Sequence, residues 1–377
     1  MAMSGLSART VSSVSTHAAG TVGLDWLVVL LSSVLVGGVY LDGWAHIHRG
    51  QLESFFTPWH GVLYAGFLAV AAVLVGVTLQ NRRRGFPGSQ AVPAGYDQAL
   101  LGVLLFGAGG AGDMIWHVLF GIETDLAALL SPTHLLLAAG GVLIVSGPLR
   151  AAWRQSSEAD RSLIDYIPIV LSMTLLMAVL AFMTQYVHPF GTTWAAGPRS
   201  PDRLLGDAAP LEFAGFPLGQ YFVFFEQLST VAGILLQTAI MMGVILTALR
   251  RWKLPAGSLT FVLTVSVAMI TFMRERFVAM GPPVLIAVAF VGGVAADALL
   301  IRLRPSPERS AAVRLFAFAV PAIFYALYIA SLALTVGTWW SVHMWTGAIV
   351  LAGITGLLVS YLVVPAPRDL SVPVAGE

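Results

Sequence analysis

Ten apolar stretches, each about as long as a membrane-spanning helix, dominate the sequence. They cover residues 25–46, 58–80, 97–119, 132–148, 165–187, 220–248, 258–277, 281–301, 313–335 and 341–363. A helix needs roughly 20 apolar residues to cross a bilayer, where every backbone polar group must bond within its own segment. The stretches therefore predict an all-α, polytopic transmembrane helical bundle of about ten spans.

The composition excludes most other classes of protein. Charged residues make up 10% of the chain, whereas a soluble domain carries about 25%, so we expect the lipid bilayer to surround this protein. The absence of long basic runs argues against a nucleic-acid partner. The chain has no cysteine, which excludes thiolate metal sites and a cysteine nucleophile. Any metal must therefore be bound by His, Asp, Glu or Met.

The basic residues predict the orientation. Fifteen of the 20 Lys and Arg residues fall in the two tails and in alternate loops, which makes that side cytoplasmic by the positive-inside tendency. No short apolar core with a cleavage site precedes the first span, so we expect it to be an uncleaved anchor. The sequence thus predicts a multi-pass protein of the cytoplasmic (inner) membrane with both termini in the cytoplasm. Its parts are a tail (1–22), a four-helix half (23–148), a six-helix half (149–363) with an outer loop (188–219), and a second tail (364–377).

Four of the eight histidines belong to an internal repeat in spans 1–4. One copy reads LDGWAH and then TPWH, ending at His46 and His60; the other reads GDMIWH and then SPTH, ending at His117 and His134. The first and third spans run in the same direction, so we predict a parallel repeat of two helical hairpins. All four histidines then lie at the outer ends of their spans.

The residue types in the repeat predict a metal site. Asp and His four residues apart share one helix face, and Ser or Thr followed by Pro starts a helix with a hydroxyl cap. Packing the hairpins together would bring two Asp and four His to one layer, a set that suits zinc, copper, iron or manganese. The predicted metal ligands are Asp42, His46, His60, Asp113, His117 and His134. A structural polar cluster and heme ligation are the alternatives; heme would leave the aspartates only to orient imidazoles.

Three further ionisable residues are candidates for the same outer face. Glu226 lies about two turns into the sixth span, so we predict a catalytic role as ligand or proton relay; the alternative is a protonated Glu bonded to a neighbouring backbone. Arg274 and Arg276 close the seventh span. They are predicted to bind a substrate carboxylate or lipid phosphates as a cofactor-binding pair, and the alternative is that they snorkel to the interface.

The triplet of Asp42, His46 and His60 resembles the metal site of the membrane-embedded C subunit of particulate methane and ammonia monooxygenases, the copper membrane monooxygenases. That subunit holds a metal with an Asp, a His four residues on, and a second His in the following region. Asp113, His117 and His134 match the pattern less closely. The resemblance covers roughly twenty residues per copy and implies copper-dependent oxidation of a small apolar substrate or a lipid.

Four functions remain open on the sequence. The first is a metal-dependent, monooxygenase-like oxidoreductase, with copper favoured and iron or zinc as alternatives, acting on a small apolar or lipid-soluble substrate. The second is a transporter or sensor for a divalent metal or protons. A zinc-dependent lipid hydrolase is the third. The fourth is a structural or heme-binding subunit of a larger membrane complex.

Overall fold

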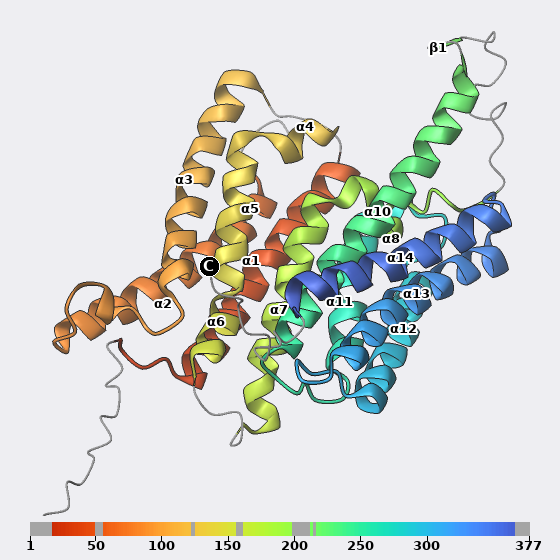
Figure 1. Ribbon diagram of the computed structural model, residues 1–377. Coiled ribbons are helices and arrows are strands. Elements are labelled where there is room, and N and C mark those ends of the chain that lie inside the picture. Colours follow the sequence, from red (N-terminus) through yellow and green to blue (C-terminus); the bar gives the residue numbers. More distant parts are fainter. Residues whose placement is uncertain are drawn as a thin grey trace, which may run out of the picture.

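The computed structural model describes residues 17–49, 56–121, 125–155, 161–197, 212–213 and 216–365, which form an all-α polytopic bundle (Figure 1). Its first half contains α1 (Val22–His48), α2 (Pro58–Arg83), α3 (Asp97–Phe120), α4 (Asp125–Leu130), α5 (Pro132–Val145) and α6 (Gly147–Arg154). Its second half contains α7 (Leu163–Met183), α8 (Pro189–Thr192), α10 (Leu218–Leu249), α11 (Ser258–Met273), α12 (Pro282–Leu303), α13 (Ser310–Thr335) and α14 (Val342–Val363). The 3-10 turns are η1 (Gly88–Ala91), η2 (Gln185–Val187) and η3 (Glu275–Phe277), and the strands β1 (Glu212–Phe213) and β2 (Phe216–Pro217) pair antiparallel.

Within the described residues, nine helical segments are long and apolar enough to cross a membrane. One of them combines α5 and α6. The seventh predicted span is shorter than expected, since α11 has 16 residues and is therefore about 24 Å long, against about 30 Å for the hydrocarbon core. The chain leaves the α-helix at Arg274, whose side chain bonds the Gly191 carbonyl oxygen.

Neighbouring helices pack as antiparallel pairs, and α1, α5 and α6 of the first half all contact α7 of the second half. The pairs include α1 with α2, α3 with α5, α11 with α12, and α13 with α14, while α1 also packs on α7 and α11. Glycines allow α1 and α2 to approach closely: a Cβ on Gly38 would lie 2.6 Å from the Leu63 backbone, and one on Gly66 would lie 2.5 Å from the Leu35 backbone. Small residues at such contacts are typical of helix pairs in membranes.

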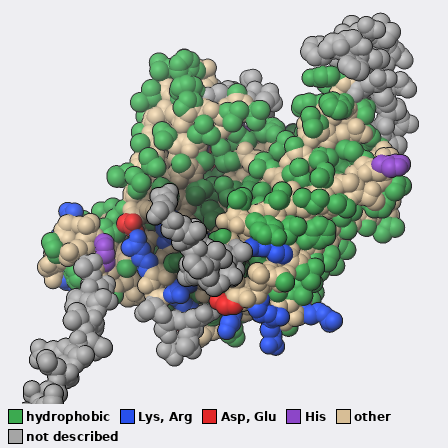
Figure 2. All heavy atoms as spheres, in the orientation of Figure 1, with side chains coloured by type: hydrophobic (Ala, Val, Ile, Leu, Met, Phe, Trp, Pro, Cys, Tyr) green, Lys and Arg blue, Asp and Glu red, His purple; other side chains and the backbone are tan. Residues whose placement is uncertain are grey.

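The surface agrees with a lipid environment. Apolar side chains cover most of the face in Figure 2, and the visible Lys and Arg side chains gather in its lower part. Leu68, Leu104 and Val118 are exposed by 62%, 70% and 80%, which in water would form an unusually large apolar surface. The chain is thus an integral membrane protein, whereas the orientation of its termini stays a prediction. Most of the predicted tails and much of loop 188–219 lie outside the described residues.

Candidate metal centres

The structure brings the six predicted ligands together as two groups. The first triad consists of Asp42 and His46 on α1 and His60 on α2; the second triad consists of Asp113 and His117 on α3 and His134 on α5. In each triad, one potential ligand atom per residue lies within 4.8 Å of the others. Both groups could therefore hold a metal ion. The predicted repeat as a whole stays a prediction.

Local sequence places the histidine that starts the second helix of each group. The Thr57 hydroxyl oxygen accepts a hydrogen bond from the His60 backbone N–H at 3.2 Å, and Pro58 begins α2. Ser131 does the same for His134 at 3.3 Å, with Pro132 at the start of α5. The predicted hydroxyl caps are confirmed. Each cap fixes its histidine in the first helical turn, facing the aspartate of the neighbouring helix.

The distances within the triads suit shared binding of an ion. Asp42 Oδ2 lies 3.6 Å from His46 Nε2 and 3.5 Å from His60 Nε2. In the second triad, Asp113 Oδ2 lies 3.3 Å from His117 Nε2, and Asp113 Oδ1 lies 3.5 Å from His134 Nε2. An N–H···O hydrogen bond spans about 2.7–3.2 Å. Two ligand atoms bound tetrahedrally to one zinc-sized ion lie about 3.4 Å apart, which is closer to the observed values.

The outer nitrogens of three imidazoles have partners of their own. His117 Nδ1 lies 3.2 Å from the Gly121 carbonyl oxygen, which can only accept a hydrogen bond, so Nδ1 carries the proton. His134 Nδ1 lies 2.6 Å from the Ser131 hydroxyl, and His60 Nδ1 lies 3.2 Å from the Thr57 hydroxyl. Such partners are typical of metal-binding histidines because they orient the ring; the Gly121 carbonyl also fixes the tautomer of His117, whereas a hydroxyl can donate or accept. In that tautomer the Nε2 lone pair of a neutral ring faces a carboxylate, an arrangement that a cation between them stabilises.

The two aspartates differ in their surroundings. The Asp113 side chain is 1% exposed, and Thr133 Oγ1 donates a hydrogen bond to its Oδ1 at 3.0 Å. The Asp42 side chain is 14% exposed, and its Oδ1 atom is buried without a hydrogen-bond partner. A buried polar atom without a partner calls for an explanation such as an ion. Asp42 is therefore suited to bind a metal ion. Its carboxylate receives fewer hydrogen bonds from the protein than that of Asp113.

Tyr64 on α2 lies close to both triads. Its ring centroid is 6.2 Å from that of His60, and the charges of Asp42 and Asp113 both act on its phenol. A Cβ on Gly110 of α3 would lie 2.8 Å from Tyr64 Cε1, so a larger residue there would displace the Tyr64 ring. The two triads are thus neighbouring sites with a phenol beside them.

An apolar pocket of about 520 Å³ lies between α2 and α3 beside the first triad. His60 and Tyr64 form part of its wall, and Phe67, Leu68 and Met114 contribute apolar surface. Among the six triad residues, only His60 lines this pocket. The pocket therefore gives the first triad a neighbouring space for an apolar molecule.

The structure does not bring the other predicted site residues into either triad. Glu226 lies on α10, which packs on α7, α13 and α14. Arg274 donates hydrogen bonds from Nε to the Gly191 carbonyl and from Nη1 to Gln185 Oε1, both at 3.0 Å, and Arg276 Nη1 donates to the Ile47 carbonyl at 2.9 Å. These contacts join the end of α11 to its neighbours. The catalytic and cofactor-binding roles of the three residues stay predictions.

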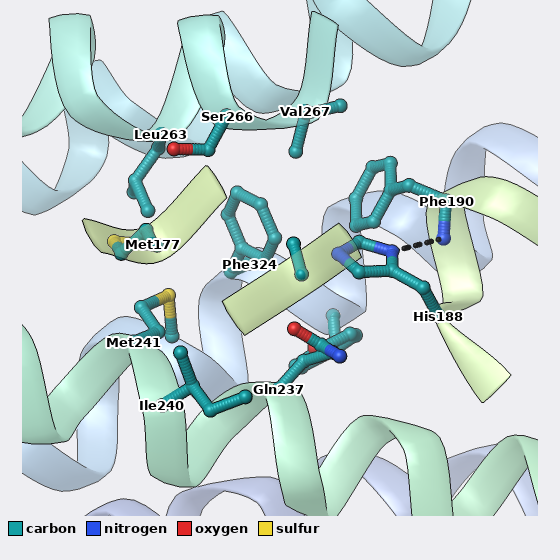
Figure 3. Close-up of a pocket in the computed structure, with 12 residues that line it drawn as sticks. Met177, His188, Phe190, Gln237, Ile240, Met241, Leu263, Ser266, Val267 and Phe324 are labelled. Carbon is teal, nitrogen blue, oxygen red and sulfur yellow. Dashed lines mark hydrogen bonds between the residues drawn. The ribbon is translucent and has the colours of Figure 1, made fainter. Parts of the chain in front are cut away.

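His188 lies in a different, enclosed environment (Figure 3). Its Nδ1 accepts a hydrogen bond from the Phe190 backbone N–H at 3.2 Å, and it lines a cavity of about 30 Å³ with Met177, Gln237 and Met241. That volume suits a single water molecule. Burial, and then the charge of Arg274, lower the pKa of His188 to about 3. His188 is thus a neutral histidine within the helix bundle and belongs to neither triad.

Sequence reasoning missed three residues that shape the triads: Thr133, Gly121 and Tyr64. One signal was present for Thr133, because it occupies the place in SPTH that Trp59 occupies in TPWH. Because Thr133 carries a hydroxyl and Trp59 does not, this difference predicts that Asp42 and Asp113 have different hydrogen-bond partners. Gly121 acts through its backbone oxygen and Tyr64 through its position between helices, so neither has such a signal.

Comparison of the chain with protein-family models, curated proteins and solved structures found no match. The functional interpretation therefore depends on the geometry of the triads and the pocket.

Proposed function

We propose that this integral membrane protein is a metal-dependent oxidoreductase that acts on a small apolar or lipid-soluble molecule. The observation that carries the proposal is the pair of triads in which imidazole Nε2 atoms face an aspartate at 3.3–3.6 Å. Three protein ligands leave coordination positions open, as in catalytic rather than structural metal sites. Two His and one carboxylate are typical of oxygen-activating iron sites, while imidazole also suits copper. The resemblance to the monooxygenase C subunit favours copper.

The residues of the two triads and their neighbours would have different roles in binding the metal and the substrate. Asp42 and Asp113 supply negative charge, and the four histidines supply neutral nitrogen ligands. Thr57, Ser131 and the Gly121 carbonyl hold three of the imidazole rings in place through Nδ1. A bound copper or iron ion would supply the electron-transfer chemistry that these side chains lack. The apolar pocket beside His60 would keep water away and place the substrate.

One observation argues against the alternative of metal or proton transport. A transporter needs polar groups along a path across the membrane, and Asp297 is a buried acidic residue of α12 toward the predicted cytoplasmic side. Its carboxylate instead accepts hydrogen bonds from the backbone N–H groups of Leu259 and Thr260 at 3.3 and 2.9 Å. Asp297 therefore caps the start of α11, where the N-cap residue Gly257 offers no side chain. Asp297 thus stabilises the start of a helix, which argues against a role in a transport path.

Elemental analysis of the purified protein, combined with absorption and electron paramagnetic resonance spectra, tests the proposal. We expect copper or iron at up to two ions per chain, and loss of both in the double variant Asp42→Ala, Asp113→Ala. His343→Ala is the matched control, because this histidine begins α14 and belongs to neither triad. Zinc alone would favour the hydrolase, a heme spectrum would favour the heme-binding subunit, and protein without metal would overturn the proposal.

A further inference from the structure

The pocket between α2 and α3 has a wall that selects for uncharged molecules. Among the described residues, those that line it include no Lys, Arg, Asp or Glu. The polar side chains among these described lining residues are Thr57, which caps α2, and His60 and Tyr64 on α2; the others are apolar side chains, glycine and alanine. A charged ligand would lose its hydration there without gaining an opposite charge. The wall therefore favours a neutral, largely apolar occupant.

The pocket opens toward the surface that lipid covers. Leu68 and Met114 on its rim are 62% and 38% exposed, while Phe67 at its base is 8% exposed. All three lie on segments long and apolar enough to cross a membrane. A molecule dissolved in the bilayer can thus reach the pocket without passing through water. An apolar cavity of about 150 Å³ is sufficient to bind benzene, and this one is about 520 Å³.

We propose that this pocket binds a neutral aliphatic molecule that enters from the bilayer between α2 and α3, and that it serves the first triad. His60 is the connection, since it is both a wall residue and a member of that triad. The second triad has no residue in the wall. The binding step stands on the pocket alone, whereas its use as a substrate site rests on the proposed metal-dependent function.

Two glycines in the wall allow the pocket to be filled without disturbing the packing. A Cβ on Gly61 of α2 would meet no atom within 4 Å, and a Cβ on Gly107 of α3 would meet Phe67 only at an ordinary 3.5 Å. Gly61→Leu and Gly107→Leu therefore fill the pocket from opposite sides. Gly76→Leu is the matched control, because Gly76 lies on the same helix as Gly61, is exposed, and also has no atom within 4 Å of its Cβ.

The test is photolabelling of the full-length protein in lipid nanodiscs with an uncharged alkyl diazirine, followed by mapping of the labelled residues. We expect labelling of Leu68 and Met114 to saturate and to be displaced by decane but not by decanoate. Each pocket-filling variant should weaken saturable binding at least tenfold, whereas Gly76→Leu should leave it unchanged. Labelling that does not saturate, equal displacement by decanoate, or full binding by both filled variants would overturn the proposal.

The same experiment separates this inference from the metal function. Labelling is repeated on chelator-treated protein, where retained saturable binding supports the pocket whatever the metal analysis shows. In metal-loaded His134→Ala protein, only the first triad is intact, and we expect decane to change its electron paramagnetic resonance spectrum. An unchanged spectrum with retained labelling would overturn the link between the pocket and the first triad.

Discussion

The two triads contain the same ligand types, yet they lie in different surroundings. In the second triad, Asp113 is 1% exposed and bonded to Thr133, and His117 is 9% exposed. In the first triad, Asp42 is 14% and His46 36% exposed, and His60 lines an apolar pocket. His60 is 13% and His134 27% exposed, so the contrast lies in the aspartates and in the histidines that follow them on the same helix. In that sense the second triad is the more closed and the first the more open. The comparison teaches that equal sets of side chains can differ in accessibility because the residues around them differ.

The difference can be followed to one position in the sequence. Thr133 directs its hydroxyl to Asp113. The residue in the matching place of TPWH is Trp59, whose ring packs edge-on against Trp44 and beneath the Arg49 guanidinium. An indole ring there leaves Asp42 Oδ1 without a hydrogen-bond partner. We interpret the second triad as the tighter, more permanent metal site and the first as the site that meets substrate.

The largest expected effect comes from removing one histidine from each triad in turn. His60→Ala should abolish metal binding at the first triad and His134→Ala at the second, each reducing the metal content by one ion per chain. Loss of a histidine that binds the metal directly should matter more than loss of a residue hydrogen-bonded to a ligand, which costs about 10–100-fold in affinity. Elemental analysis of the purified variants measures this.

The matched control is His343→Ala, which should retain all of the metal, since His343 lies on α14 away from both triads. Loss of both ions from either single variant would contradict two separate sites. It would show instead that the six residues form one shared centre, and the comparison between an open and a closed triad would then fail.

A smaller effect is expected when azide is added as an external ligand. The more exposed first triad should bind it, so the His134→Ala protein should show an azide-dependent absorption change, because only its first triad holds metal. The His60→Ala protein should respond at least tenfold more weakly. A spectrophotometric titration of both variants decides this, and an equal response would show that exposure does not separate the two sites.

The sequence contained enough to predict the helical bundle, since uninterrupted apolar stretches leave few alternatives within a bilayer. It also contained the grouping of the first triad, because Asp42 and His46 share a helix face and the Thr57–Pro58 cap fixes the start of the helix that carries His60; that these residues bind a metal stays a prediction. The short α11 could not be predicted, because its end depends on where Arg274 meets Gly191, a residue far away in the chain. The exposure of the triad side chains likewise depends on contacts between helices, which the sequence does not reveal.

A third experiment exchanges the residues that distinguish the triads. Thr133→Val removes the hydrogen bond to Asp113 and should weaken metal binding at the second triad about 10–100-fold, as expected for an outer-shell partner. The first triad should be unaffected. Competition with a chelator of known affinity, followed by elemental analysis, measures both sites.

The reciprocal change, Trp59→Thr, offers a hydroxyl to Asp42 and should tighten metal binding at the first triad. Together the two variants should reverse the order of affinity. If Thr133→Val weakened both sites equally, the hydrogen bond would be acting on the stability of the bundle rather than on Asp113, and the single-position explanation would be wrong.

The prediction furthest from the metal chemistry concerns His188, the buried histidine outside both triads. Its pKa of about 3 in the folded protein lies below the unfolded value of about 6.5, so between these pH values the unfolded chain binds a proton that the folded chain does not. Stability therefore rises with pH across this window and falls as pH drops below about 6.5. In chelator-treated protein, the melting temperature of His188→Gln should fall less steeply on acidification than that of the unmodified chain. The variant should also keep its full metal content at neutral pH. If the melting temperatures of the two proteins fell equally steeply with pH, the buried neutral state of His188 would be contradicted. Loss of metal from the variant would place His188 among the ligands.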